Sequence, residues 1–464
     1  MLRLQREEIR RFRTLIRRCR VRTSMNDVTL RVVAANGTLQ FIGAMPDMTL
    51  SVTRKHDAGE GDWCLPGDFL DLVETANTDA VELHTTFPSP VRCRWQADGR
   101  DCERVFELVK ANVPALPDSP ERGSDADSSI LNALHEASQT ADRAPVRYAT
   151  HRIQLQGSTG RIVATDTRQA ILLDGFRFPF TETLLIAASP VFGAKEWQGE
   201  SVKIGRTANR VVLAIGSWIL ALNIDATGKF PEVSSIVPKS FTPTVVHFDE
   251  REARFILARL DHWPQSDPDG GITLDTTGDR VVLRCQGETD DRPTEVRLPA
   301  SRVSGPPIRF VFDRKYLKRA LALGFRTHQM CGAEKPIVMR DRDRTYLAAG
   351  LHPSEAVPPH DEAHTIAPDG SINGCRRIRR PLPPLLEKIM PLPAPNSIPR
   401  IASDAIANDT NDPLAEAEAI RNLLAEAMQR AQQLVQVLKA KRKTDRAITQ
   451  VVRSIQALPL NGRS

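Results

Sequence analysis

The arginines near the start of the chain have the type and the spacing to bind a polyanion. If residues 7–19 form a helix, its apolar face holds Ile9, Phe12, Ile16 and Cys19. A separate face then carries arginines at steps of three and four residues, namely Arg6, Arg10, Arg13 and Arg17. Aligned guanidinium groups repel one another unless an anion lies beside them, and a phosphate backbone provides that anion. We expect these four arginines and Arg20 to contact such a backbone, with a solvated basic face as the alternative.

A second basic segment lies late in the chain and is smaller. Around the apolar residue Leu317 it carries four cations: Arg314, Lys315, Lys318 and Arg319. A middle segment expected to be helical, residues 128–141, has no Lys or Arg at all. The sequence also lacks a ladder of aromatic side chains on which single-stranded bases could stack. This pattern favours non-specific binding of a duplex through its backbone charge.

Signatures of catalysis and of metal binding are missing from the sequence. It contains no P-loop, no G-x-S-x-G and no C-x-x-C pair. His360 and His364 stand four residues apart around two carboxylates, but they lie in a Pro-flanked stretch without an apolar helical face. We therefore expect no catalytic residues, no metal and no cofactor.

Composition is consistent with a soluble, intracellular protein of several domains. The chain has 464 residues, 41% of them hydrophobic, 26% charged and only 5% aromatic. The net charge of +6 is concentrated at the start, where residues 1–22 hold nine arginines against two glutamates. The seven cysteines are scattered, which fits a reducing cytoplasm. The longest apolar run, residues 211–222, is too short to cross a bilayer.

The elements that would position the basic segments recur three times, about 120 residues apart. Polar openings of helices occur near Glu7, Ser128 and Asp249, strands follow at residues 38–42, 161–164 and 280–283, and aromatic-led helical segments follow at Phe69, Phe192 and Tyr316. Units of this length are whole small domains rather than solenoid repeats. Short alternating strands with few helices predict α+β domains. We place their boundaries at residues 1–124, 125–241 and 242–351.

The chain changes character after Leu351. Residues 352–412 are rich in proline, so we expect an extended or disordered linker. A helical tail is expected over residues 413–459, where apolar side chains recur every three to four residues in a coiled-coil seam. Two interpretations of this tail stay open: a helical hairpin that docks on its own chain, and a helix for self-association or a partner.

Short motifs in the middle unit resemble the second domain of bacterial DNA polymerase III beta sliding clamps. They are Arg147-Tyr148, Val163-Ala164-Thr165-Asp166, Gly228-Lys229-Phe230-Pro231 and Ile236-Val237-Pro238-Lys239. The resemblance extends over residues 1–351 in domain order. It implies three tandem clamp domains forming half a ring, two chains pairing head to tail, and duplex DNA in a hole lined by basic helices. By the same resemblance, Arg147 and Tyr148 lie in a loop that contacts DNA.

The resemblance also implies a partner pocket, and there the chain departs from the family. The pocket would comprise Thr165, Thr167, Arg168, Ala170, Pro238, Leu347 and Ala349. The family's Thr-Asp-Gly-His-Arg-Leu reads Thr165-Asp166-Thr167-Arg168-Gln169-Ala170 here. Ala170 offers the pocket less apolar surface than the leucine of the family's motif. Thr167 places a β-branched residue where the family's glycine allows unusual backbone angles. Family members end after a strand like residues 346–351, whereas here the chain continues to residue 464. We expect the added tail to supply, cover or replace the usual contact.

Taken together, the sequence predicts a non-catalytic DNA-encircling processivity or tethering factor of replication or repair. Its partners would be double-stranded DNA, a DNA polymerase or repair proteins, and a second copy in a homodimeric ring. It would act in the cytoplasm, on the nucleoid. The alternative is a clamp-derived scaffold that no longer encircles DNA and assembles through its helical tail. A hydrolase or nuclease has little support.

Overall fold

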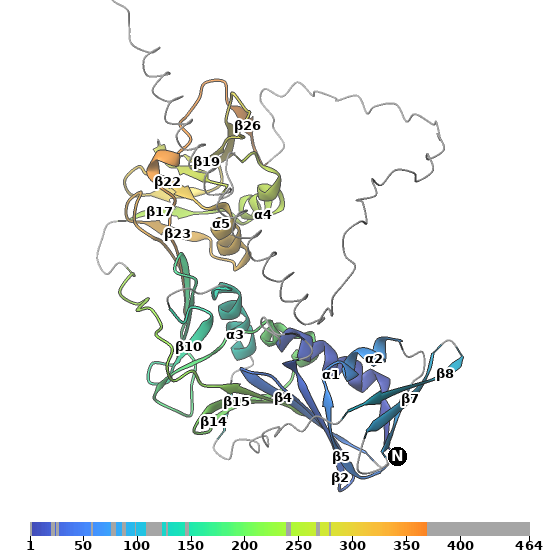
Figure 1. The fold of residues 1–464 in the computed structure, drawn as a ribbon. Helices are drawn as coiled ribbons and strands as arrows, with labels where there is room; N and C mark the ends of the chain where they lie inside the picture. The colour runs from blue at the N-terminus through green and yellow to red at the C-terminus, as the bar shows by residue number, and fades with distance from the viewer. Residues whose placement is uncertain are drawn as a thin grey trace, which may run out of the picture. The chain divides into compact units, whose positions relative to one another are not determined.

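The structure is a computed structural model of the whole chain (Figure 1). It describes residues 2–19, 24, 27–56, 59–75, 80–85, 90–97, 99–107, 123–126, 129–143, 148–237, 243–265, 270–277 and 280–368.

Three modules of similar element order follow one another. The first comprises β1 (Leu2–Gln5), α1 (Arg6–Cys19), β2 (Thr29–Ala35), β3 (Thr38–Ala44), β4 (Met48–Lys55), β5 (Gly61–Pro66), α2 (Phe69–Thr75), β6 (Ala80–Thr85), β7 (Val91–Ala97) and β8 (Arg100–Phe106). The second comprises β9 (Ser124–Ala126), α3 (Ser129–Thr140), β10 (Arg152–Gln156), β11 (Arg161–Thr165), β12 (Gln169–Leu173), β13 (Thr183–Ala187), η2 (Pro190–Gly193), η3 (Lys195–Trp197), β14 (Val202–Arg206), β15 (Arg210–Ile215) and β16 (Trp218–Asn223).

The third module repeats the plan with one additional short strand. It comprises β17 (Thr244–His247), α4 (Glu250–Arg259), η4 (Leu260–His262), β18 (Ile272–Asp275), β19 (Val281–Cys285), β20 (Thr294–Leu298), β21 (Arg302–Ser304), β22 (Arg309–Phe312), α5 (Arg314–Ala322), β23 (Thr327–Met330), β24 (Ile337–Asp341) and β25 (Arg344–Ala348). Two short elements follow it, η6 (Pro353–Glu355) and β26 (His364–Ile366).

Sheets that run from one module into the next hold the modules together. The sheet orders are β1-β6-β7-β8, β5-β2-β3-β4-β16-β15-β14-β9, β13-β10-β11-β12-β25-β24-β23-β17-β21 and β22-β18-β19-β20-β26. The eight-stranded sheet joins the first two modules through β4 and β16, and the nine-stranded sheet joins the last two through β12 and β25. The predicted α+β class and threefold repetition are confirmed.

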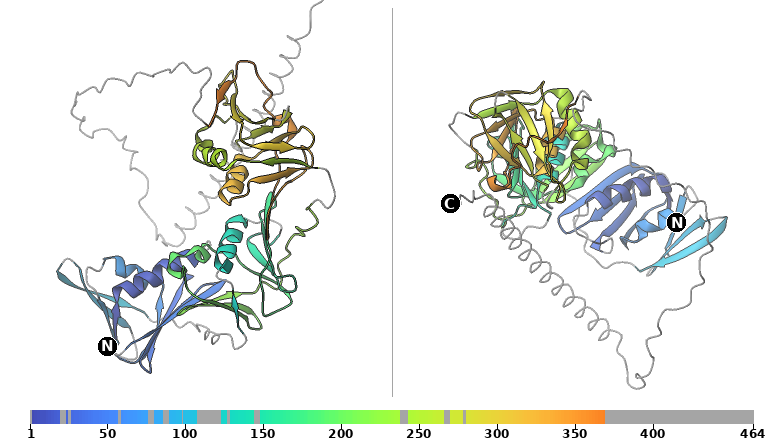
Figure 2. Two further views of the ribbon diagram at one scale, coloured as in Figure 1. Left: turned by 180° about the vertical axis from the view of Figure 1, so that it is seen from behind. Right: turned by 90° about the horizontal axis from the view of Figure 1, so that it is seen from above.

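The helices are amphipathic and pack with their apolar sides on the sheets. On α1 the predicted apolar residues Ile9, Phe12, Ile16 and Cys19 are buried together with Leu15. The ring of Phe12 lies 5.6 Å from that of Phe41 and 6.3 Å from that of Trp218. Figures 1 and 2 show α1 and α2 lying on the same side of the first-module strands. Burial of α1 leaves only its remaining faces for solvent or a ligand.

The second module departs from the expected plan at its short aromatic-led helix. The chain forms two 3-10 turns there, η2 and η3, separated by Ala194 in an extended conformation. Ser189 caps the first turn by accepting a hydrogen bond from the amide of Val191. Pro190 suits a helix start and Gly193 favours its end, so these four residues make one short turn instead of an α-helix.

The ordered chain continues beyond the boundary that we placed at Leu351. Residues 353–355 and 364–366, which we expected in an extended or disordered linker, form η6 and the paired strand β26. The expected helical tail over residues 413–459 lies outside the described residues. None of the helices in the described ranges combines the length and hydrophobicity needed to span a membrane.

Candidate nucleic-acid interface and partner pocket

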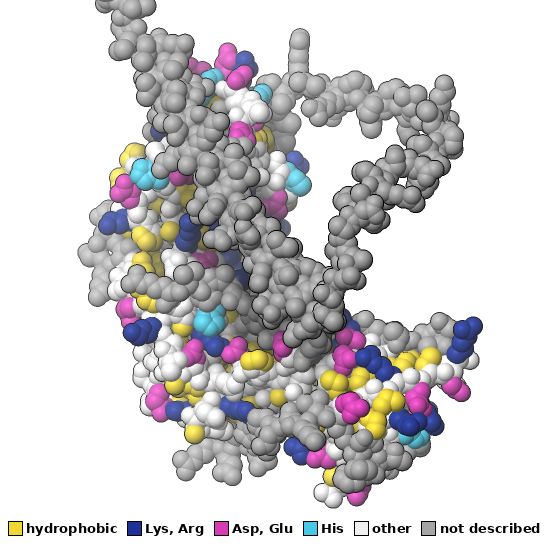
Figure 3. All heavy atoms as spheres, in the orientation of Figure 1, with side chains coloured by type: hydrophobic (Ala, Val, Ile, Leu, Met, Phe, Trp, Pro, Cys, Tyr) yellow, Lys and Arg dark blue, Asp and Glu magenta, His cyan; other side chains and the backbone are white. Residues whose placement is uncertain are grey.

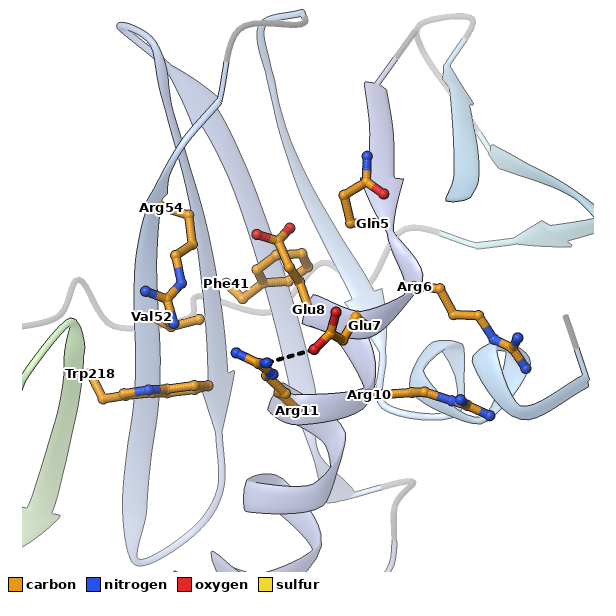
Figure 4. Close-up of a pocket in the computed structure, with 10 residues that line it drawn as sticks. All are labelled: Gln5, Arg6, Glu7, Glu8, Arg10, Arg11, Phe41, Val52, Arg54 and Trp218. Carbon is orange, nitrogen blue, oxygen red and sulfur yellow. Dashed lines mark hydrogen bonds and ion pairs between the residues drawn. The ribbon is translucent and has the colours of Figure 1, made fainter. Parts of the chain in front are cut away.

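The first turns of α1 present arginines on two sides of the helix (Figure 4). Arg6 and Arg10 extend from the same side, whereas Arg11 turns the other way and pairs with Glu7 at 2.5 Å. Arg10 is exposed and has no ion pair among the described residues. A hollow of about 680 Å³ surrounds these turns, and its far wall includes Arg54 and Trp218. Arg6, Arg10 and Arg11 can therefore reach a ligand from the N-terminal end of α1.

Arg13, which we expected to line the basic face, is buried instead. It is 5% exposed, and its Nε and Nη2 donate to Oδ1 of Asp71 at 3.0 and 2.6 Å. The carboxylate comes from α2, so this bond connects the two helices of the first module. Arg17 remains about half exposed, 3.7 Å from the same carboxylate. The prediction for Arg13 is corrected to a structural role, because the α1–α2 contact covers its position on the helix.

Arg314 is likewise buried and unavailable to a ligand. Its guanidinium donates to four backbone oxygens, those of Gly270, Leu260, Trp263 and Pro264, at 2.6 to 3.3 Å. The side chain is 7% exposed. The helix begins at this residue, capped by Asp313, so Arg314 turns back toward the preceding loop. The prediction that Arg314 contacts DNA is therefore wrong.

Arg319 connects two modules. Its Nη2 donates to the backbone oxygen of Glu136 at 2.8 Å and to Oγ1 of Thr140 at 2.7 Å, and its Nη1 donates to Oε1 of Gln139 at 3.1 Å. Burial lowers the pKa of the Arg319 guanidinium, and nearby Tyr346 and Glu136 oppose that shift. The C-terminal end of α3 is a favourable place for a cation, and Arg319 adds a charged donor there. We remove Arg319 from the set of DNA contacts.

Two lysines on α5 keep exposed ammonium groups. Lys315 lies 3.1 Å from Asp313 and 4.7 Å from the centroid of the Tyr316 ring, and Lys318 pairs with Asp261. Burial and the charge of Asp166 raise the pKa of Tyr316 to about 12, so the phenol stays protonated at neutral pH. A second hollow of about 340 Å³ lies beside Lys315, between α5, the end of α3 and the turn before β12.

Sequence reasoning missed the arginines of α4. This helix stands in the third module where α1 stands in the first, and Arg251, Arg254 and Arg259 are exposed on it. Arg254 pairs with Glu250, and Arg259 lies over the Phe255 ring at 5.4 Å. The helix opening at Asp249 was recognised, so the spacing of its arginines was a usable signal. Figure 3 shows cationic and anionic side chains intermixed on the visible face, without one continuous basic patch.

Three predicted site residues lie outside the described residues: Arg20, Arg147 and Pro238. Tyr148, the neighbour of one of them, is 37% exposed. The following residue, Ala149, donates its amide to the backbone oxygen of Lys229 at 2.9 Å. The segments around Tyr148 and Lys229, both of which carry the family-like motifs, thus lie side by side.

The predicted partner-pocket residues within the described ranges do come together, around the turn between β11 and β12. Oγ1 of Thr165 donates to the backbone oxygen of Gln169 at 2.6 Å and accepts from the amide of Thr167 at 3.0 Å. Thr167 has a φ of 76°, in the left-handed region that glycine favours. The backbone oxygen of Arg168 accepts from the amide of Ala349 at 2.7 Å. The turn therefore keeps a glycine-like conformation without a glycine.

Ala170 and Leu347 form the apolar part of this site. They lie directly opposite each other in the pairing of β12 with β25, and both are buried. They belong to a small cluster, separate from the main core, whose other members are Val163, Leu172, Val233, Val338, Phe230 and Val237. Sequence reasoning did not assign these six residues to the site, although the alternation along β11 and β12 could have identified Val163 and Leu172.

Comparison with solved structures identifies the fold. The sliding clamp of Bacillus subtilis has a TM-score of 0.64 at 15% identity, covering 75% of this chain and 98% of the clamp. The Pseudomonas aeruginosa DnaN clamp bound to griselimycin has a TM-score of 0.62 at 17% identity, covering 76% and 99%. The Borrelia burgdorferi DNA polymerase III beta subunit has a TM-score of 0.62 at 12% identity, covering 75% and 97%. The chain has the sliding-clamp fold.

The clamp fold accounts for nearly the whole length of these proteins but only three quarters of this chain. No protein-family model matches the sequence, and no curated protein sequence matches it significantly. The match therefore rests on backbone arrangement, and the sequence differs widely from those of the solved clamps. The resemblance inferred from the motifs of the middle unit is confirmed at the level of the fold.

Proposed function

We propose that this protein is a non-catalytic tethering factor that encircles duplex DNA as a head-to-tail homodimer. The observation that carries the proposal is the match of three consecutive modules to almost the full length of bacterial sliding clamps. For this arrangement we propose the domain limits 1–124, 125–241 and 242–351. Replication or repair proteins on the nucleoid would be its partners in the cytoplasm.

The proposed DNA contacts are the cations that stay accessible on the helices. They are Arg6, Arg10 and Arg17 on α1, Lys315 and Lys318 on α5, and Arg251 on α4, together with Arg20, Arg147 and Tyr148 from the sequence prediction. Such side chains bind phosphates and read no base edges, so binding should be independent of sequence and weaken steeply with salt. The proposed partner pocket keeps Thr165, Thr167, Arg168, Ala170, Pro238, Leu347 and Ala349.

Titration of the protein with duplexes of unrelated sequence tests DNA binding. The proposal predicts equal affinities and a linear decrease of the logarithm of the binding constant with the logarithm of salt concentration. Binding that depends on sequence, or does not respond to salt, would contradict it.

The alternative function, a clamp-derived scaffold that does not encircle DNA, is favoured by one observation. The outer edge of β20, the fourth strand of the third module, is already covered by β26 of the same chain. Light scattering at low micromolar concentration separates the two functions. A dimer supports the ring, whereas a monomer that also fails to dimerise on DNA supports the scaffold.

A further inference from the structure

The two junctions between modules pair strands that hold equivalent positions in their modules. In the first junction β4 pairs antiparallel with β16, with Leu50 opposite Leu220. In the second junction β12 pairs antiparallel with β25, with Ile171 opposite Tyr346. In both, the fourth strand of one module joins the last strand of the next. Each junction continues a sheet across two modules and buries these four side chains in one core.

Among the described residues, the repetition leaves one strand of each kind without its counterpart. The last strand of the first module is β8, which among the described strands pairs only with β7. Most of β8 is exposed, and Val105 is 48% exposed. The equivalent strands β16 and β25 are mostly buried. An exposed edge of this kind is a template for another strand.

The other strand, β20, should offer the matching edge, but it is occupied. The short strand β26 pairs with it in parallel, with Thr294 opposite His364 and Val296 opposite Ile366. The amide of His364 donates to the backbone oxygen of Pro293 at 2.9 Å. Ile366 packs against the apolar core of the module. Because one sheet edge accepts one strand, β26 lies where a further junction of the same kind would form.

Contacts to the third module anchor the segment that leads to β26, beginning with the amide of Leu351, which donates to the backbone oxygen of Val311 at 2.8 Å. Arg292 pairs with Glu362 at 2.7 Å, both side chains being at least half exposed. The amide of Val357 donates to Oγ1 of Thr273 at 2.8 Å. The strand itself is short, because β26 has three residues whereas each internal junction pairs five. Parallel pairing is also slightly weaker per residue than antiparallel pairing. A five-residue antiparallel strand would therefore form more and stronger backbone pairings at this edge than β26 does.

We propose that β26 is an autoinhibitory strand that occupies the β20 edge and competes there with β8 of a second copy of this chain. The proposal rests on the proposed head-to-tail dimer and adds a control to it. While β26 is bound, the β20 edge cannot pair with a second copy. Release of β26 exposes this edge for the second copy. The observed dimer affinity is the intrinsic affinity multiplied by the fraction of chains in which β26 is released.

The test uses full-length protein and a matched pair of substitutions at one position. His364→Pro removes the amide that bonds to Pro293, whereas His364→Ala removes the exposed side chain and keeps the amide. Hydrogen exchange at the amides of Thr294–Val296 reports whether β26 has left. Analytical ultracentrifugation measures the monomer–dimer constant. We expect His364→Pro to tighten dimerisation about tenfold and His364→Ala to leave it unchanged.

Photo-crosslinking identifies the strands that meet. Val105→benzoylphenylalanine places a crosslinker on the exposed edge of β8, and in the His364→Pro background it should link to residues 294–298 of another molecule. Faster exchange at residues 294–296 without tighter dimerisation, or crosslinks to other surfaces, would overturn the proposal. A tighter dimer that fails to hold DNA would contradict the proposed function and leave the role of β26 intact, so the two failures are distinguishable.

Discussion

The guanidinium of Arg319 on α5 lies 2.8 Å from the backbone oxygen of Glu136, at the end of α3 in the preceding module. The same cation also bonds to Thr140 and Gln139. A residue predicted from sequence to bind DNA thus closes the end of a helix in the neighbouring module. This relationship divides the cations of the helices into those that hold modules together and those that face solvent.

Replacing Arg319 should weaken the structure and leave the accessible cations in place. Arg319→Ala removes the hydrogen bonds to Glu136, Gln139 and Thr140 at the end of α3, so we expect a loss of about 2–3 kcal/mol in the free energy of unfolding. Arg319→Lys keeps the charge but cannot reproduce the forked donor geometry, so it should recover only part of that loss. Urea denaturation measures both variants. A loss below about 0.5 kcal/mol for Arg319→Ala would show that the contact between Arg319 and α3 does not stabilise the protein.

Arg10→Glu should weaken DNA binding without destabilising the fold, because Arg10 is exposed and has no ion pair among the described residues. We expect the slope of log binding constant against log salt to fall by about one or more for the reversed charge. The matched control is Arg340→Glu. Arg340 is exposed on β24 and shares a sheet face with Val338, away from the main core. Equal effects of the two substitutions would rule out a specific role for α1.

The limits of sequence reasoning are clearest at these cations. Periodicity placed α1 and its apolar face correctly, because burial of a helix face depends on local spacing. It could not separate Arg10 from Arg13, since only the position of Asp71 on α2 decides which arginine is buried. Similarly, the motif around Thr165 located the turn beside β25, but Val233 and Val338 come from distant segments. The strand β26 was missed because three residues are too few for a periodic signal.

Thr167→Gly should stabilise the protein. The threonine has a φ of 76°, where a β-branched residue is strained and glycine is not. We expect a gain of about 0.5–1 kcal/mol after the greater flexibility of glycine in the unfolded chain is offset. Asn36→Gly is the control, because Asn36 has a φ of 52° but asparagine tolerates this region. Chemical denaturation compares the two. A larger gain at Asn36 than at Thr167 would contradict the strain argument.

Asp275 should make stability depend on pH at the acidic end. Burial opposes ionisation of its carboxyl, but hydrogen bonds from Thr277, Arg284 and Arg309 outweigh burial and lower the pKa to about 2. A depressed folded-state pKa means that the stabilisation is complete above the unfolded value near 3.8 and is lost as pH falls toward 2. It amounts to about 2 kcal/mol. Asp275→Asn should flatten the unfolding free energy over this window, and an unchanged profile would refute the assignment.

His328 should make the free energy of unfolding depend on pH in a separate and higher pH range. It is fully buried beside Phe248, and burial lowers its pKa from 6.5 to about 4, although Nε2 donates to the backbone oxygen of Phe325. The unfolded chain binds this proton more readily, so stability falls as pH decreases from 6.5 to 4. His328→Gln keeps a donor and cannot titrate, and its unfolding free energy should decline less over that range. If the unfolding free energy of the variant fell with pH as steeply as that of the wild type, His328 would not be the source of the dependence.

Encirclement of DNA is the central claim, and a ligation trap tests it most directly. Linear duplex is incubated with the full-length His364→Pro protein, its ends are ligated, and the circles are washed at high salt to remove protein held only by charge. The account predicts that protein stays on ligated circles, is absent from unligated DNA, and is released when a restriction enzyme cuts the circle. Equal retention on linear and circular DNA, or loss from both, would contradict it.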